Sequence, residues 1–258
     1  MAITFYKYHG TGNDFVIIDN RKGDIKLTQS EVKHLCDRRF GIGADGLMLL
    51  QEKPGYDFEM VYFNSDGRTS SMCGNGGRCL TRFAYDMGIH KDRFRFMAID
   101  GEHEAVRADN GWINLKMKDV NGIREHRGDA VLDTGSPHYV KAVDDVMSLD
   151  VYHQGKEIRY SREYEAAGIN VNFVEPDDDR IIVRTYERGV EDETYSCGTG
   201  VTAAALVFAH NDNGFNRIEV QTKGGYLAVE FDKTMDQRFE NIWLCGPATF
   251  VYKGEIIM

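Results

Sequence analysis

The sequence contains one short segment twice, and this repeat limits how the chain can fold. The first copy is Met72-Cys73-Gly74-Asn75-Gly76, and the second is Ser196-Cys197-Gly198-Thr199-Gly200. The two cysteines lie 197 − 73 = 124 positions apart. Each copy comes just before an apolar run that predicts a buried helix. The chain should therefore build the same cysteine turn twice, once in each of two similar halves.

Other segments repeat in the same order at nearly the same offset, which supports a duplicated half of about 120 residues. The matches are Gly12-Asn13-Asp14-Phe15-Val16 with Ser136-Pro137-His138-Tyr139-Val140, Gly41-Ile42-Gly43 with Gly168-Ile169-Asn170, and Val61-Tyr62-Phe63-Asn64 with Arg184-Thr185-Tyr186-Glu187. The strand pattern is interrupted at 119–127 by Asn-Gly and several charges, so we expect the boundary there. The predicted domains are 1–118, completed by a C-terminal strand at 247–258, and 119–246.

Short alternating or apolar runs bounded by Gly, Asn and Asp predict strands of a mostly antiparallel sheet. The clearest strands are expected at 15–19, 47–50, 58–63, 112–117, 181–186 and 226–231. Helices are expected at 29–39, 76–87 and 200–211, and the last two are too apolar for surface helices. The predicted fold class is α+β, with two pseudo-symmetric halves that each wrap a barrel-like sheet around a central helix.

Composition excludes several classes of protein. The 258 residues carry a net charge of −10, which disfavours a nucleic-acid partner. We expect no membrane segment and a cytoplasmic location, because no apolar run is long enough to span a bilayer and no secretory signal is evident. The five cysteines show neither a disulfide framework nor the spacing of a zinc site, so we expect no metal. We also find no phosphate-binding loop, dinucleotide fingerprint or pyridoxal-lysine motif, and we expect no cofactor.

A cysteine at the start of a helix has a distinctive environment. The first backbone N–H groups of a helix have no partner within it, and the helix dipole is positive there. Both features favour a thiolate over a thiol. The same N–H groups can hold a carboxylate, and the flanking glycines let a ligand approach closely. For a single cysteine, the simpler explanation is a tight helix start. Two copies, in Cys73 and Cys197, favour a functional role.

Two equivalent thiols suit the inversion of a carbon centre. That reaction needs a base on one face of the carbon and an acid on the other, and a thiolate with a thiol can fill both roles. We expect a pseudo-two-fold arrangement to bring both helix starts to one cleft between the halves. Helix-start N–H groups there would bind the substrate α-carboxylate and stabilise the negative charge that develops when the α-proton leaves.

With these residues in view, the sequence resembles the diaminopimelate epimerase family over nearly its whole length. The resemblance rests on Gly10-Thr11-Gly12-Asn13-Asp14-Phe15, on Asn64-Ser65-Asp66-Gly67 with the Cys73 segment through Cys79, and on Tyr186-Glu187-Arg188-Gly189 with Glu193-Thr194 and the Cys197 segment. It implies a cofactor-independent isomerase that interconverts LL- and meso-2,6-diaminopimelate for lysine and peptidoglycan synthesis. It also implies two similar halves, each rolled around a helix.

Site residues follow from the resemblance position by position. Cys73 and Cys197 match the catalytic thiols, and His138 matches a histidine that assists catalysis. Glu187 and Arg188 match a pair that orients the amino group and the far end of the substrate. The remaining matches are the side-chain ligands Asn13, Asn64 and Asn170, and the backbone donors Gly74, Asn75, Gly198 and Thr199.

Two positions depart from the family pattern. The family often has Gln where this chain has Gly46, and usually Asn where it has Ser136. Serine keeps a hydrogen-bonding group in the predicted substrate site, whereas Gly46 is expected to leave extra room that water or another side chain fills. Asp45 and Asp66 are interpreted as turn residues, and Cys36, Cys79 and Cys245 as core thiols.

Four other functions are alternatives to this interpretation. A proline or hydroxyproline racemase of the same superfamily remains the main one, although Arg188 and the polar Asn set favour a substrate with a second charged end. An isomerase of the phenazine-biosynthesis type would not use two thiols. A thiol oxidoreductase would normally show Cys-x-x-Cys. A cysteine hydrolase using His138 gives no reason for a duplicated thiol. The expected partner is the small-molecule substrate, and the oligomeric state stays open, with a homodimer as the candidate.

Overall fold

The computed structural model describes residues 2–235 and 237–257, which form four helices and seventeen strands. Contacts within the chain divide it into two compact units. Unit 1 comprises Met1–Leu115 and Pro247–Met258, and unit 2 comprises Lys116–Gly246. Whether each unit is a domain in its own right remains a prediction. No helix in the described residues is long and apolar enough to cross a membrane.

The two units have the same order of elements except for the places of β17 and β13. Unit 1 contains β1 (Ala2–Gly10), β2 (Asn13–Asp19), α1 (Gln29–Cys36), β3 (Gly46–Gln51), β4 (Phe58–Asn64), α2 (Gly74–Asp86), β5 (Arg93–Ala98), β6 (Gly101–Arg107), β7 (Ile113–Lys116) and β17 (Thr249–Ile257). Unit 2 contains β8 (Arg124–His126), β9 (Asp129–Asp133), β10 (Pro137–Ala142), α3 (Val151–Arg159), β11 (Asn170–Asp177), β12 (Arg180–Glu187), β13 (Asp192–Thr194), α4 (Gly198–Val207), β14 (Gly214–Thr222), β15 (Gly225–Lys233) and β16 (Phe239–Gly246).

The strand pairings repeat as well. Unit 1 pairs its strands in the order β17–β1–β2–β3–β4–β5–β6–β7, and unit 2 in the order β8–β9–β10–β11–β12–β14–β15–β16. Along both orders the pairings run antiparallel, antiparallel, parallel, antiparallel, parallel, antiparallel and antiparallel. The two halves predicted from the sequence repeat are therefore two copies of one topology.

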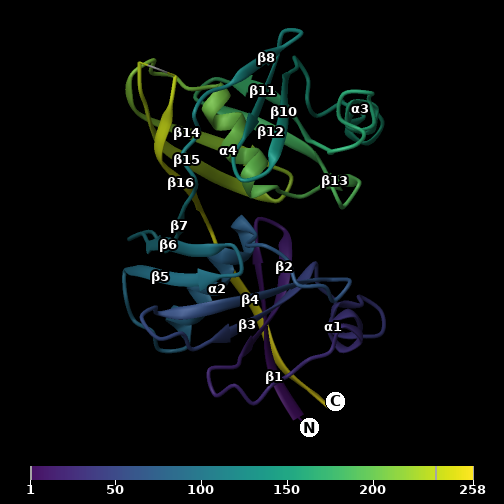
Figure 1. Ribbon diagram of the computed structural model, residues 1–258, viewed down its shortest axis with the longest axis vertical. Coiled ribbons are helices and arrows are strands. Elements are labelled where there is room, and N and C mark those ends of the chain that lie inside the picture. The colour runs from purple at the N-terminus through teal and green to yellow at the C-terminus, as the bar shows by residue number, and fades with distance from the viewer. Residues whose placement is uncertain (1, 236, 258) are drawn as a thin grey trace. The chain divides into compact units, whose positions relative to one another are not determined.

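Each unit wraps its sheet around one helix. In unit 1, α2 contacts β1, β2, β3, β4 and β6, and in unit 2, α4 contacts β9 to β12 and β14 to β16 (Figure 1). Eight of the ten residues of α4 are buried, including Val201 and Leu206. A helix surrounded by sheet has little solvent-facing surface, which explains why α4 lacks the polar stripe of a surface helix. Helix α2 is buried over most of its length and meets solvent through Arg82 and Asp86 near its C-terminal end. Both buried central helices were predicted correctly.

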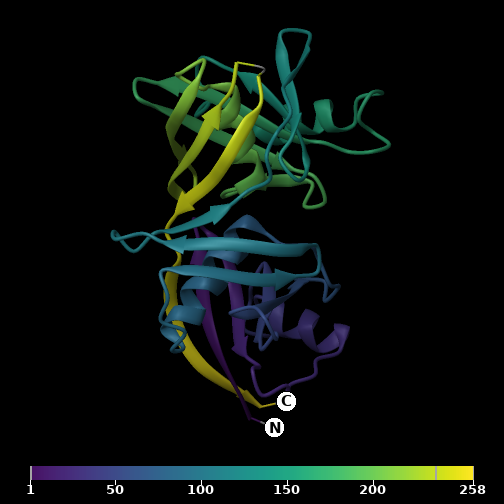
Figure 2. The same ribbon diagram turned by 60° about the vertical axis from the view of Figure 1, so that its left-hand side comes forward.

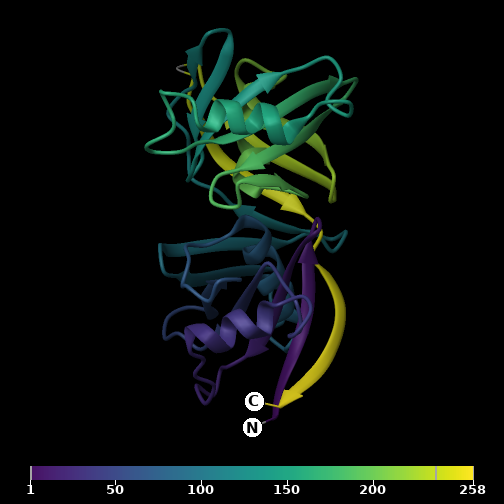
Figure 3. The same cartoon turned by 90° about the vertical axis from the view of Figure 1, so that its right-hand side faces the viewer.

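Unit 1 is completed from a distant part of the chain. Strand β17 pairs antiparallel with β1 from Ala2↔Ile257 to His9↔Thr249, so the yellow and purple strands run side by side in Figures 2 and 3. Helix α1 lies outside the sheet of unit 1 and packs Val32 and Leu35 into a separate apolar cluster. Helix α3 has the equivalent place in unit 2, after β10, and was not among the helices expected from sequence.

Candidate active site

Cys73 is the N-cap residue of α2 and has an extended backbone conformation, with φ −104° and ψ 130°. No side chain caps this helix end, and its first turn contains no acidic residue. The first helical hydrogen bond runs from Gly77 N–H to Cys73 O at 2.7 Å. The N–H groups of Gly74 and Asn75 come before that bond, where a helix can bind an anion.

Cys197 has the same position on α4, with φ −110° and ψ 112°, and again no side chain caps the helix and no acidic residue lies in the first turn. The first helical bond runs from Val201 N–H to Cys197 O at 2.8 Å. The Cys197 side chain is buried, whereas Cys73 is half-buried. The Cys197 sulfur lies 3.5 Å from the Thr199 hydroxyl. The predicted cysteine turns are therefore present in both units and have the same backbone form.

Asn13 lies beside Cys73 at the start of β2. The Cys73 thiol donates to Asn13 Oδ1 at 3.6 Å, and Asn75 Nδ2 donates to the same oxygen at 3.3 Å. The Asn75 side chain is held in turn by Arg78, whose Nη2 donates to Asn75 Oδ1 at 2.9 Å. Arg78 is completely buried. Unit 1 thus brings together three predicted site residues: Cys73, Asn13 and Asn75.

Asp45 also belongs to this group, although the sequence analysis assigned it to a turn. Its Oδ2 accepts from Asn13 Nδ2 at 2.7 Å and from the Asp14 N–H at 3.2 Å. Its Oδ1 accepts from Arg38 at 2.7 Å. No local pattern around Asp45 indicates this role, because β2 and β3 are parallel and bring together residues more than thirty positions apart.

Strand register also corrects one of the sequence matches. In unit 1, Phe15 is opposite Gly46, so Asp14 and Asp45 are the preceding neighbours. In unit 2, His138 is opposite Asn170. With Asp14 equivalent to His138, the equivalent of Asn170 is Asp45. Matching Asn170 to Gly43 was wrong, because the loop before β3 is longer than the matched segments imply.

Three predicted ligands meet in unit 2. Asn170 Nδ2 donates to Ser136 Oγ at 2.9 Å and to Pro137 O at 3.0 Å, and its Oδ1 accepts from the Arg188 N–H at 2.9 Å. The Arg188 guanidinium donates to Ser136 Oγ at 3.3 Å and to Ala167 O at 3.1 Å. The hydroxyl that replaces the usual Asn at position 136 therefore links Asn170 to Arg188.

His138 is completely buried at the start of β10. Burial, reinforced by the charge of Arg188, lowers its pKa to about 3, so the ring is neutral near pH 7. Asn172 Nδ2 lies 3.1 Å from His138 Nδ1 and donates to Tyr139 O at 3.0 Å, while Asn172 Oδ1 accepts from Thr185 at 2.9 Å. Nδ1 must therefore accept, which leaves the proton on Nε2. Any help from His138 is then hydrogen-bond donation by a neutral ring.

The two remaining polar ligands lie at strand ends. Glu187 ends β12, and its carboxylate accepts from the Thr194 hydroxyl at 2.9 Å. Asn64 ends β4 with an exposed side chain, and its backbone N–H donates to Arg68 O at 3.0 Å. These positions at strand ends are compatible with the predicted contacts to substrate, which remain predictions.

The space beside Gly46 is filled rather than open. A Cβ atom at this position would lie 2.6 Å from Tyr62 Cε2 and 2.7 Å from Phe63 O. The Tyr62 ring also contacts Phe15, with ring centroids 6.1 Å apart. The side chain of Tyr62 therefore occupies the space that we expected beside Gly46. Tyr62 is on β4, the strand that pairs with β3.

The other three cysteines are buried, as expected for core thiols. Burial raises the pKa of Cys36 and of Cys79 to about 12, so neither carries charge near neutral pH. Within the residues that the structure describes, no cluster of three His, Cys, Asp or Glu side chains could hold a metal ion.

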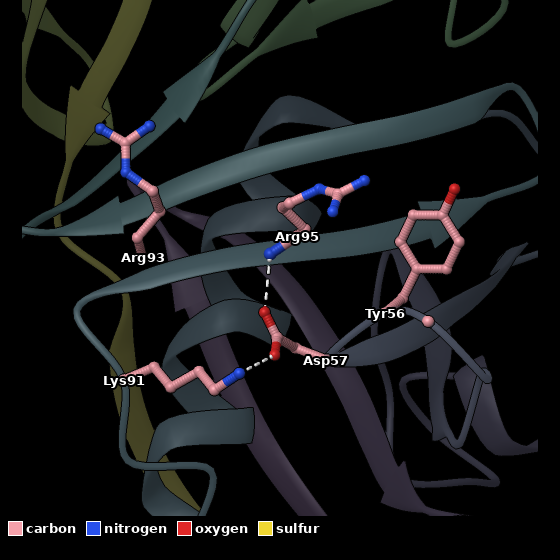
Figure 4. A pocket seen from close by; sticks show the side chains of 6 residues that line it. Tyr56, Asp57, Lys91, Arg93 and Arg95 are labelled. Carbon is pink, nitrogen blue, oxygen red and sulfur yellow. Dashed lines mark hydrogen bonds and ion pairs between the residues drawn. The ribbon is translucent and has the colours of Figure 1, made fainter.

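A surface pocket of about 400 Å³ lies elsewhere in unit 1 and includes none of the predicted site residues. Its lining side chains include Lys91, Arg93 and Arg95 (Figure 4). Each cation already has an acidic partner: Asp57, Glu104 and Glu102, respectively. The pocket is therefore close to neutral overall, and it is not a candidate for the active site.

Comparison with known families adds to this geometry. A family model described as diaminopimelate epimerase matches residues 5–132 and, separately, residues 130–251. The diaminopimelate epimerase of Flavobacterium psychrophilum is 49% identical over 97% of this chain and 99% of its own length. That of Chlorobaculum tepidum is 42% identical over 96% of this chain and 99% of its own length.

Solved structures share the fold at low identity. A phenazine biosynthesis protein from Bacillus anthracis superposes with a TM-score of 0.80 at 16% identity, covering 100% of both chains. A hydroxyproline epimerase from Agrobacterium vitis, solved with trans-4-hydroxy-L-proline, superposes with a TM-score of 0.68 at 14% identity, covering 99% of this chain and 92% of its own. At this identity the similarity is one of fold alone.

Proposed function

Because the chain belongs to the diaminopimelate epimerase family, we propose that it interconverts LL- and meso-2,6-diaminopimelate without a cofactor. The observation that carries the mechanism is the matched position of two thiols. Cys73 and Cys197 each cap the central helix of one of two units that share a topology. We also propose that these units are the two domains of the enzyme.

The chemistry assigns one thiol to each face of the substrate α-carbon. A thiolate removes the α-proton, and the other cysteine delivers a proton from the opposite face, which inverts the centre. In the reverse direction the two residues exchange roles. Thiol chemistry of this kind needs reduced cysteines, and we therefore propose the cytoplasm as the place of action.

The helix N-termini supply the electrostatic part of the reaction. The N–H groups of Gly74, Asn75, Gly198 and Thr199 belong to first helical turns that no side chain caps. We assign them to the α-carboxylate of the substrate. Negative charge spreads onto that carboxylate as the α-proton leaves, so donors aimed there stabilise the transition state more than the ground state.

Specificity for the distal end of the substrate is assigned to Arg188 with Asn170, Ser136 and Glu187. The guanidinium of Arg188 offers a planar fork that suits a carboxylate. Lysine and proline lack a distal carboxylate, so they would leave these polar groups without a partner and should be rejected. Arg188→Lys should lose much of the activity, because an ammonium group cannot present the fork.

The test is incubation of reduced protein with LL-diaminopimelate in deuterated water. We expect deuterium at the α-carbon and formation of the meso isomer. Cys73→Ala and Cys197→Ala should each abolish epimerisation, while Cys245→Ala, which removes a buried thiol, should retain it. Turnover of proline or trans-4-hydroxyproline in place of diaminopimelate would favour the other racemase class. Near-normal turnover by either catalytic single variant would contradict the two-thiol mechanism.

A homodimer is the second part of this proposal. Strand β17 carries three consecutive apolar residues that are partly exposed: Phe250 is 48%, Val251 51% and Tyr252 42% exposed. Apolar surface of this kind on a strand is a common site of association. Sedimentation should show a dimer for the unmodified chain and a shift toward monomer for Val251→Lys. A chain that stays monomeric at all concentrations would contradict this assignment.

A further inference from the structure

Asn13 lies between two groups whose hydrogen-bonding roles are fixed. Its Nδ2 is 2.7 Å from Asp45 Oδ2, and a carboxylate can only accept. The amide nitrogen must therefore face Asp45, and the amide oxygen must face the opposite way. That oxygen is 3.6 Å from Cys73 Sγ, so the sulfur meets an acceptor.

A second fixed group supports the same orientation from the other side. Arg78 is completely buried, and a guanidinium can only donate, so Asn75 must present Oδ1 to it at 2.9 Å. Asn75 Nδ2 then donates to Asn13 Oδ1 at 3.3 Å. Both amides therefore have a fixed orientation, because Asn75 accepts from the Arg78 guanidinium and Asn13 donates to the Asp45 carboxylate.

Asp45 is itself held in place. Arg38 Nη2 donates to Asp45 Oδ1 at 2.7 Å and to Asp14 Oδ1 at 2.7 Å. Asp14 is also paired with the buried Lys7 at 2.6 Å. Burial alone would raise the pKa of Asp14, but bonds to Arg38 and Lys7 outweigh it and hold the pKa below its usual range. The charged groups around Asn13 are thus Asp45, Asp14 and Arg38, with Lys7 and Arg78 farther along the network.

Unit 2 lacks this arrangement. The position equivalent to Asn13 is Pro137, which has no side-chain amide, and the position equivalent to Arg78 is Thr202, whose hydroxyl donates to Gly198 O at 3.0 Å. Cys197 faces the Thr199 hydroxyl, which can donate or accept. The amide acceptor that faces Cys73 therefore has no counterpart at Pro137, and the two thiols differ in this neighbour.

We propose that Asp45 is a positioning residue for the epimerase reaction: it locks the Asn13 amide so that its carbonyl oxygen faces Cys73 and keeps that sulfur protonated in the resting enzyme. This inference rests on the proposed function for its meaning in catalysis. The lock makes Cys73 the resting acid and leaves Cys197 as the resting base. When Asp45 is removed, the bond from Asn75 Nδ2 at 3.3 Å is the remaining constraint described for the Asn13 amide. The amide can then rotate in a fraction of the molecules and present its N–H₂ to the sulfur, which favours thiolate.

The experiment follows alkylation of Cys73 by iodoacetamide as a function of pH, with site-resolved mass spectrometry. In Asp45→Ala, the midpoint of the Cys73 curve should fall by about one pH unit, because a donor replaces an acceptor. Asp45→Asn removes the same charge but keeps an oxygen for Asn13 Nδ2, so its midpoint should lie much closer to that of the unmodified protein. The curve of Cys197 should not move in either variant.

A matched control is Asp19→Ala, which removes a carboxylate paired with Arg21 at the other end of β2. It should leave the Cys73 curve unchanged. In turnover, Asp45→Ala should lower kcat roughly 10-fold to 100-fold with little change in KM, and Asp45→Asn should recover most of it. Identical Cys73 curves for Asp45→Ala and the unmodified protein would overturn the proposal. Alkylation needs no diaminopimelate, so this result is independent of whether the proposed function holds.

Discussion

The two units share a backbone path, yet their cysteine sites are chemically different. Cys73 donates to the carboxamide oxygen of Asn13, whereas Cys197 lies beside the hydroxyl of Thr199. A carbonyl oxygen can only accept, and a hydroxyl can reverse its role when the sulfur loses its proton. A duplicated fold can thus keep two catalytic groups in matching places while their surroundings give them different resting states.

The equivalent positions at the start of β2 and β10 differ in the same way. Asp14 is a charged residue within a network of cations, and His138 is a neutral residue in a network of amides. Ion pairs therefore surround Asp14 in unit 1, whereas hydrogen bonds between uncharged groups surround His138 in unit 2. This difference should appear in the stability of variants of the two units.

The largest effect is expected for Asp14→Asn, which leaves Lys7 buried without its carboxylate. Lys7 is 6% exposed, so the free energy of unfolding at pH 7 should fall by about 3–5 kcal/mol. Urea denaturation measures this loss. The double variant Asp14→Asn with Lys7→Met should recover most of it, because the unpaired charge is gone. A single variant as stable as the unmodified protein would show that the ion pair does not hold this site.

A smaller effect is expected when a methyl group is added at matching glycines of the two central helices. At Gly200, a Cβ atom would lie 2.3 Å from Asn172 Oδ1, inside the buried amide network. Gly200→Ala should therefore lower the free energy of unfolding by about 1–3 kcal/mol. At the matching Gly76, the nearest atom is Met48 Sδ at 3.3 Å, at the end of a flexible side chain. Gly76→Ala should be near neutral, and equal losses at both positions would remove the contrast between the units.

The third prediction concerns acid stability. The pKa of His138 falls from 6.5 to about 3 in the folded chain, so between these values the unfolded state binds a proton that the folded state does not. Stability should therefore decline as the pH falls through this window, by about 1.4 kcal/mol per pH unit from this group. His138→Gln should show a shallower decline in urea denaturation at pH 4 to 6. The same slope in both proteins would mean that His138 is protonated in the folded chain.

The fold was largely predictable from sequence because its strongest signal is local. The repeated cysteine turn and the apolar runs after it indicate two buried helices, and the structure contains both as α2 and α4. Helix α3 was missed because only Val151 and Gly155 are buried, which leaves little apolar periodicity. The one clear start signal in that segment is the N-cap residue Asp150, whose side chain accepts a hydrogen bond from the His153 N–H.

Two features of the candidate site could not be predicted, for a common reason. Asp45 reaches Asn13 through parallel pairing of β2 with β3, and Tyr62 fills the space at Gly46 through antiparallel pairing of β3 with β4. Both contacts depend on strand register, which a single sequence specifies weakly when a strand is buried on both faces. For this reason Asp45 was interpreted as a turn residue, and the contact of Tyr62 with Gly46 was not predicted.

The pairing of β1 with β17 has a consequence for synthesis on the ribosome. All of unit 2 is encoded between these strands, so it leaves the ribosome before unit 1 can acquire its last strand. Until β17 is synthesised, the edge of β1 that it covers in the folded chain stays unpaired. An unpaired strand edge can form hydrogen bonds with other chains. Protease digestion of stalled nascent chains should find unit 2 protected before β1. Unit 1 therefore begins to be synthesised first but is completed last, because β17 can pair with β1 only after the whole of unit 2 has been synthesised.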